Sequence, residues 1–262
     1  MTIIFALQTK LLKQLPIKDI LLAQRIYFIL GVLFISALVV GNLIFQKFFT
    51  WDFFGLYTFE ISVGILPYPI TFLITDIISE VYGKKKANQV VTAGIFASLF
   101  SLIIVYLADM VPATTWSPVD DVLFSKVFGA TAIAVFASML AYLLAQYIDI
   151  QLFHFWKRVT KGKYLWLRNN FSTFLSQFVD TFAVLLLLCL FGKIAWSLFT
   201  ALLVSGFLFK VLMAALDTPL LYASVYVLRK RFGLNIGEEL NLQYNAATLQ
   251  HTGTTPEEIK QE

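Results

Sequence analysis

Two short stretches place a glutamine and an aspartate three residues apart inside apolar sequence. The stretch QYID ends at Asp149, and the stretch QFVD ends at Asp180. Residues three apart lie on one face of a helix, so Gln146 pairs with the first aspartate and Gln177 with the second. A carboxylate accepts two hydrogen bonds, and an amide both donates and accepts. Each pair therefore suits the edge of a guanine-like base, which offers adjacent N–H donors beside a carbonyl.

Two further charges interrupt the last apolar segment. Lys210 and Asp217 are seven residues apart, which puts them two turns apart on one helix face. A charge at membrane depth costs about 2.5–3.5 kcal/mol and usually marks function. We expect Lys210 to pair with Asp180, either to bind a ligand or only to join two helices. The first pair, Gln146 and Asp149, falls near the end of its apolar segment, so simple solvation is its alternative reading.

Composition predicts that these residues lie in a polytopic membrane protein. The chain has 262 residues, of which 59% are hydrophobic and 14% charged, with a mean hydropathy of +0.78. Soluble domains carry about 25% charged residues. A membrane span needs roughly 20 apolar residues. Six segments qualify, so we expect an all-α, six-helix transmembrane bundle with spans at 26–45, 57–75, 88–108, 127–148, 171–191 and 197–228.

Basic residues predict the orientation of the chain. With six spans, fifteen of the 20 Lys and Arg fall on the side that holds both termini, and only Lys47, Lys126 and Lys193 fall on the other. Such a bias marks the cytoplasmic side. We therefore expect a lead-in at 1–25, a transporter domain at 26–232 and a polar cytoplasmic tail at 233–262. The basic composition then reflects topology in a lipid bilayer, and nucleic acid is not an expected direct partner.

Prolines predict breaks in two of the spans. Pro67 and Pro69 lie close together in the second span, and Pro219 follows Asp217 in the sixth. Proline removes a backbone donor and clashes with the preceding turn. Broken helices near the membrane midplane often mark transporter binding sites.

A second set of polar residues is expected at the cytoplasmic mouth. Asp76 and Glu80 are four residues apart and come just before three lysines at 84–86. We expect these carboxylates to meet Arg168 and Asn170, either as a gate beside the binding site or as an interfacial salt-bridge cluster. The lysines themselves act as the anchor that ends the second span.

The motifs of common enzymes do not occur in the sequence. It contains no GxxxxGK[ST] phosphate loop, no HExxH zinc motif and no GxSxG elbow. We therefore expect a protein that is not an enzyme, with no cofactor and no bound metal.

Aromatic rings near the polar residues, such as those of Tyr68 and Tyr147, either pack against helices or stack on a flat ligand.

Three blocks of sequence resemble the queuosine precursor transporters, within the vitamin uptake transporter family. They are PITFLITDIISEVYGKKKA at 69–87, QYIDIQLFHFWKRVTKGKYLWLRNNFSTFLSQFVDT at 146–181 and FKVLMAALDTPLLY at 209–222. The resemblance covers roughly residues 25–232. It implies a six-helix protein of the bacterial inner membrane, similar to the substrate-binding components of energy-coupling vitamin transporters.

The resemblance also implies the substrate. The expected function is import of deazaguanine precursors of queuosine, a modified base of tRNA, by secondary or facilitated transport without a dedicated ATPase. The alternative is an importer or binding subunit for another flat heterocycle, such as a vitamin or nucleobase, which needs a separate ATP-driven module. The sequence leaves the oligomeric state open, a homo-oligomer included.

Overall fold

The computed structural model describes residues 12–13, 16–129, 132–192, 194–240 and 242. Residues 1–11 and 14–15 of the predicted lead-in, and 241 and 243–262 of the predicted tail, lie outside the described residues, as does Lys193.

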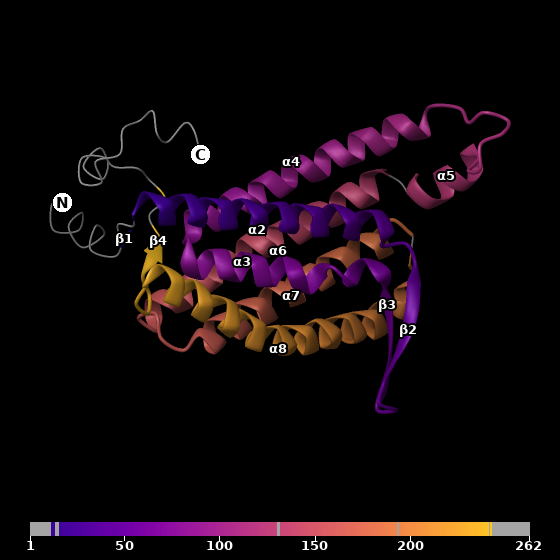
Figure 1. The fold of residues 1–262 in the computed structure, drawn as a ribbon. Coiled ribbons are helices and arrows are strands. Elements are labelled where there is room, and N and C mark those ends of the chain that lie inside the picture. Colours follow the sequence, from indigo (N-terminus) through magenta and orange to yellow (C-terminus); the bar gives the residue numbers. More distant parts are fainter. Residues whose placement is uncertain (1–11, 14–15, 130–131, 193, 241, 243–262) are drawn as a thin grey trace, which may run out of the picture.

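Helices form most of the described chain, and the main ones run side by side in a bundle (Figure 1). Five segments are long and apolar enough to cross a membrane: 17–44, 63–81, 84–109, 165–190 and 196–232. Helix α6 lies beside them but starts next to residues outside the described chain, so the count of six spans stays a prediction. The bundle helices are α2 (Ile17–Ile44), α3 (Tyr68–Val81), α4 (Lys84–Asp109), α6 (Ala132–Val159), α7 (Leu165–Leu190) and α8 (Phe199–Phe232).

A β-hairpin occupies the place where the second span was expected to begin. Strands β2 (Phe48–Phe53) and β3 (Tyr57–Ser62) pair antiparallel, and the turn between them places Phe54 and Gly55 at positive φ. In β3, the alternate residues Phe59 and Ile61 are buried, as expected for a strand with one covered face. The prediction of a helix over 57–75 is therefore wrong in its first half, and the fold is mostly helical rather than purely so.

The prolines of the second span start a helix instead of breaking one. A short 3-10 turn (η1, Val63–Ile65) follows the hairpin, and Pro67 then stands at the N-cap of α3 with Pro69 in its first turn. Proline fits there because the first N–H groups of a helix have no partner within it. Pro219 lies inside α8, which continues through it, so the predicted interruption of the sixth span is wrong.

Other helix limits also differ from the expected spans. Helix α2 begins at Ile17, inside the predicted lead-in. A separate short helix, α5 (Asp121–Phe128), capped by the Asp120 side chain, precedes α6. Helix α6 continues to Val159, well beyond the predicted end of the span at 148. Residues after 148 that were expected outside the span therefore belong to this helix.

Helix α3 is the centre of the bundle. Every residue from Ile74 to Val81 is buried, and α3 contacts α2, α4, α6 and α8. Its 14 residues span about 21 Å, less than a membrane crossing, and the candidate span at 63–81 adds η1 to them. Close contact fixes η1 against α2, because a Cβ on Gly64 would lie 2.7 Å from the Gly41 carbonyl oxygen.

The two ends of the bundle differ in character. The hairpin end carries β2, β3 and α5, and the opposite end, here the basic end, carries the start of α2, the α3–α4 and α6–α7 loops and the end of α8 (Figure 1). There β1 (Leu12–Lys13) pairs in parallel with β4 (Glu239–Leu240). Leu234 and Leu240 are buried, so the described start of the predicted tail packs against the bundle.

Candidate functional site

A cavity with a polar floor lies between the helices at the hairpin end. It has a volume of about 230 Å³, which suits one small ligand. Two exposed residues, Phe48 and Glu60, also line it. Its walls come from α2, β3, η1, α7 and α8 and are mainly apolar, including Leu38, Phe45, Ile61, Val184, Leu185, Leu188 and Leu202.

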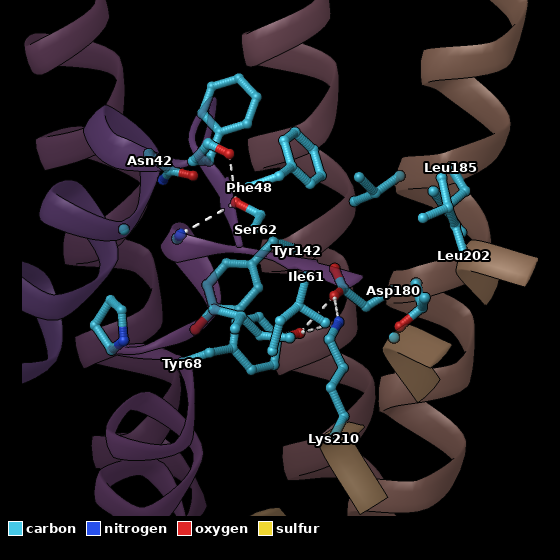
Figure 2. A pocket seen from close by; sticks show the side chains of 18 of the residues that line it. Asn42, Phe48, Ile61, Ser62, Tyr68, Tyr142, Asp180, Leu185, Leu202 and Lys210 are labelled. Carbon is cyan, nitrogen blue, oxygen red and sulfur yellow. Dashed lines mark hydrogen bonds and ion pairs between the residues drawn. The ribbon is translucent and has the colours of Figure 1, made fainter. Parts of the chain in front are cut away.

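Three polar side chains close the floor of this substrate-sized cavity. In Figure 2, Tyr68 and Lys210 converge on the carboxylate of Asp180. The Tyr68 hydroxyl and the Lys210 ammonium both donate to Asp180 Oδ2, each at 2.5 Å, and the ammonium lies 3.2 Å from the Tyr68 hydroxyl oxygen. The predicted pairing of Lys210 with Asp180 is confirmed.

The floor is buried yet has unused bonding capacity. The Asp180 side chain is 3% exposed and that of Lys210 is 9% exposed. Asp180 Oδ1 has no hydrogen-bond partner within the described chain. The ammonium also lies 4.3 Å from the centre of the Tyr68 ring, so the tyrosine holds the cation with both its hydroxyl and its π face. Sequence placed Tyr68 only among rings near polar groups and did not assign it to the ion pair.

Gln146 supports the cavity from behind instead of lining it. Its amide nitrogen donates to the Tyr142 hydroxyl at 2.9 Å and to Thr71 Oγ1 at 3.4 Å, and its oxygen accepts from Thr75 at 3.2 Å. Tyr142 in turn donates to Thr71, and both of these residues line the cavity. Gln146 is fully buried, so the solvated reading is wrong, and its bonds position Tyr142 beside the floor.

Asp149 is likewise buried and does not line the cavity. Its Oδ1 accepts from the Ser176 hydroxyl at 3.0 Å, and it neighbours the carboxyl group of Asp76 on α3. Burial follows from the extension of α6 by more than two turns past this residue. The solvated reading is wrong here as well.

A second, smaller cavity lies on the other side of the floor. It has a volume of about 20 Å³, and Tyr68 and Lys210 line it as well as the larger cavity. Gln177 and Asp217 line this inner cavity together with Asp76. The helix face shared by Gln177 and Asp180 is therefore divided, because the first faces the inner cavity and the second the substrate-sized one.

A buried charge network closes the basic end of the bundle. Arg168 donates to Glu80 through two nitrogens, at 2.7 and 3.2 Å, and both side chains are fully buried. Arg229 on α8 also bonds Glu80, and Lys157 on α6 lies 3.6 Å from it and 2.9 Å from Glu239. The predicted meeting of Glu80 and Arg168 is confirmed. Arg229 and Lys157 are two of the fifteen basic residues from which the sequence predicted only the orientation.

Asn170 and Asp76 do not join this network. The Asn170 amide donates to the Trp166 carbonyl at 2.8 Å and lies 3.4 Å from Thr218 Oγ1, away from Glu80. Its neighbour Asn169 is the residue that faces the inner cavity. A one-residue step rotates a helix position by about 100°, so the sequence identified the right turn but the wrong face.

Within the described residues, no three His, Cys, Asp or Glu side chains are grouped so that they could hold a metal ion.

Apolar spans around a buried ion pair and a small cavity define a multi-pass membrane protein of the transporter class. A family model described as "Putative vitamin uptake transporter" matches residues 62–224, which run from the end of β3 into α8. The chain belongs to this vitamin uptake transporter family. A Bacillus subtilis (strain 168) protein named "Probable queuosine precursor transporter" is 28% identical over 189 residues, covering 72% of this chain and 80% of that protein. No solved structure matches the chain significantly.

Proposed function

We propose that the chain imports a deazaguanine precursor of queuosine across the bacterial inner membrane. The observation that carries this proposal is the Asp180 carboxylate at the floor of an apolar cavity. One of its oxygens has no hydrogen-bond partner among the described residues. The name of the Bacillus relative supports the same substrate class.

The proposed binding mode uses exchange of donors at Asp180. Two adjacent N–H groups on the edge of a deazaguanine would bind the carboxylate side by side, taking Oδ1 and competing with Lys210 and Tyr68 for Oδ2. The ring of Tyr142, which lines the cavity, would pack against the flat base. A substrate that lacks paired donors would leave the buried carboxylate unsatisfied, which is the basis of selectivity.

The arrangement of the ends supports an outward-facing state. The substrate-sized cavity reaches the hairpin end, and the Glu80 network ties α3, α6, α7 and α8 together at the basic end. The Lys and Arg bias assigns the basic end, with both termini, to the cytoplasm. In this proposal α6 also crosses the membrane, which makes six spans. Import then requires the Asp180 floor and the Glu80 network to open in turn.

The remaining predicted site residues take supporting roles in this proposal. Gln146 and Asp149 hold the α6 side of the site through the hydroxyls that surround them. Gln177, Asp217 and Asp76 line the inner cavity beyond the floor, so they would contact the substrate only after the floor opens and the helices around this cavity separate.

The test is uptake of labelled deazaguanine precursor by the purified chain in liposomes. Asp180→Asn keeps the shape of the side chain but removes its charge, and we expect it to reduce uptake at least tenfold, since one charged hydrogen bond contributes about 1.5–3 kcal/mol. Asp52→Asn, at an exposed position of β2, is the matched control and should transport normally. Unchanged uptake by Asp180→Asn, at equal protein in the membrane, would disprove the base-edge assignment.

The same assay separates the alternative function. Binding of the precursor without uptake by the purified chain would indicate a subunit that needs a separate ATP-driven module. Uptake of a labelled vitamin or purine by a chain that does not take up labelled precursor would indicate another flat heterocycle.

A further inference from the structure

Helix α7 presents a row of oxygen-bearing side chains to the inner cavity. Asn169, Thr173 and Gln177 are spaced four residues apart, so they lie on one helix face, and all three line the cavity. Each is 3% exposed. Asn169 Oδ1 and Gln177 Oε1 have no hydrogen-bond partner within the described chain. Buried polar groups are normally paired, so these two oxygens point to a missing ligand.

Carboxylates face this row from two other helices. Asp76 on α3 and Asp217 on α8 line the same cavity, and the Asp149 carboxyl lies next to that of Asp76. Among the described residues, no Lys, Arg or His lies within 4.0 Å of any of these three carboxylates. Lys210 lines the cavity, but its ammonium is bonded to Asp180. Among the described residues, the cavity therefore collects oxygen acceptors and acidic side chains without a basic group bonded to them, which is costly at membrane depth.

The size and chemistry of the cavity fit one small cation. Its volume of about 20 Å³ is enough for a single water-sized body, and far too small for a heterocycle. The donor atoms are amide, hydroxyl and carboxylate oxygens, the ligands of hard cations. A divalent ion is disfavoured, since the described residues contain no group of three acidic ligands around one point. We propose that this cavity binds Na⁺ through Asn169, Thr173 and the carboxylates of Asp76 and Asp217, with Gln177 one turn further along α7.

The position of the cavity links the ion to transport. Tyr68 and Lys210 separate the two cavities and line both, so a cation on one side acts on the groups that hold Asp180 on the other. Na⁺ is thereby the coupling ion for uptake. This coupling rests on the proposed function, whereas Na⁺ binding itself does not.

Ion binding is measured first on the purified full chain, without substrate. Thermal unfolding is followed in detergent at constant ionic strength while NaCl replaces choline chloride, with KCl in a parallel series. A ligand that binds the folded state raises the unfolding midpoint in a saturable way. We expect Na⁺ to raise it more than K⁺ does. Asn169→Ala and Thr173→Ala should each weaken the apparent Na⁺ affinity about tenfold or more, as expected for loss of one bond to a charged group.

The matched control is Asn170→Ala, which removes the same side chain one position along, where it bonds Trp166 and Thr218 outside the cavity. It should keep the wild-type Na⁺ response. An absent Na⁺ effect in the wild-type chain would overturn the proposal, as would an equal response in all three variants.

Uptake in liposomes then separates the two proposals. Uptake that depends on a Na⁺ gradient supports both. Na⁺ binding without any uptake would contradict the transport function and leave the ion site standing. Uptake driven by a proton gradient in a chain that does not respond to Na⁺ would overturn the ion site and leave the transport function standing.

Discussion

The buried pair of Lys210 and Asp180 can be tested by its contribution to folding. Lys210→Met keeps most of the side-chain length but removes the one basic group bonded to Asp180 among the described residues. Asp180→Asn removes the opposite charge. The two variants and the double variant form a thermodynamic cycle that isolates the interaction from the effects of each side chain alone.

The magnitudes follow from the bonds that remain in each variant. Breaking a buried pair costs about 3–5 kcal/mol. After Lys210→Met, Asp180 keeps the Tyr68 hydroxyl, so we expect the lower end, about 3 kcal/mol. After Asp180→Asn, Lys210 keeps the Tyr68 hydroxyl at 3.2 Å and its ring at 4.3 Å, so we expect about 2 kcal/mol. The double variant contains no buried charge here, and we expect it to lose only about 2 kcal/mol.

The assay is equilibrium unfolding in mixed micelles with increasing SDS, followed by tryptophan fluorescence. The three values correspond to an interaction energy of about 3 kcal/mol, at the upper end for directly contacting residues. A double variant whose loss equals the combined losses of the single variants would refute the reasoning, because it would show that the two charges do not stabilise each other.

Two further predictions use the same measurement. Glu80→Gln should lower the free energy of unfolding by about 3–5 kcal/mol, since it leaves buried Arg168 without its counter-charge. Glu239→Gln changes a side chain that is 31% exposed and should lower it by less than about 1 kcal/mol. Similar losses in both variants would contradict the assigned role of burial. Gln146→Leu should cost about 2 kcal/mol, because the buried hydroxyls of Tyr142 and Thr75 lose a partner, and a neutral result would show that this network is not held by the amide.

The ion pairs were the part of the site that sequence predicted best. Lys210 and Asp180 each lie deep in an apolar segment, and a buried charge needs a partner, so few arrangements were open to them. The same argument found Glu80 with Arg168. It could not find Arg229 or Lys157, because a basic residue near a span end is explained equally well by topology.

Residues outside charge pairs were harder to place. Asn169 and Asn170 differ only in helix phase, and an apolar segment carries little periodic signal to fix that phase. Tyr68 acts through tertiary contacts with α7 and α8, which no local pattern records. The hairpin was missed because its strands are rich in aromatic and aliphatic residues, which a count of apolar residues cannot distinguish from a membrane helix.

The most direct test of the account uses bacteria that lack both synthesis of queuosine precursors and their own importer. The chain is expressed in these cells, precursor is supplied at low concentration, and the queuosine content of tRNA is measured. The account predicts that wild-type chain and Asp52→Asn restore queuosine and that Asp180→Asn does not. Absence of queuosine with the wild-type chain present in the membrane would contradict import of this precursor.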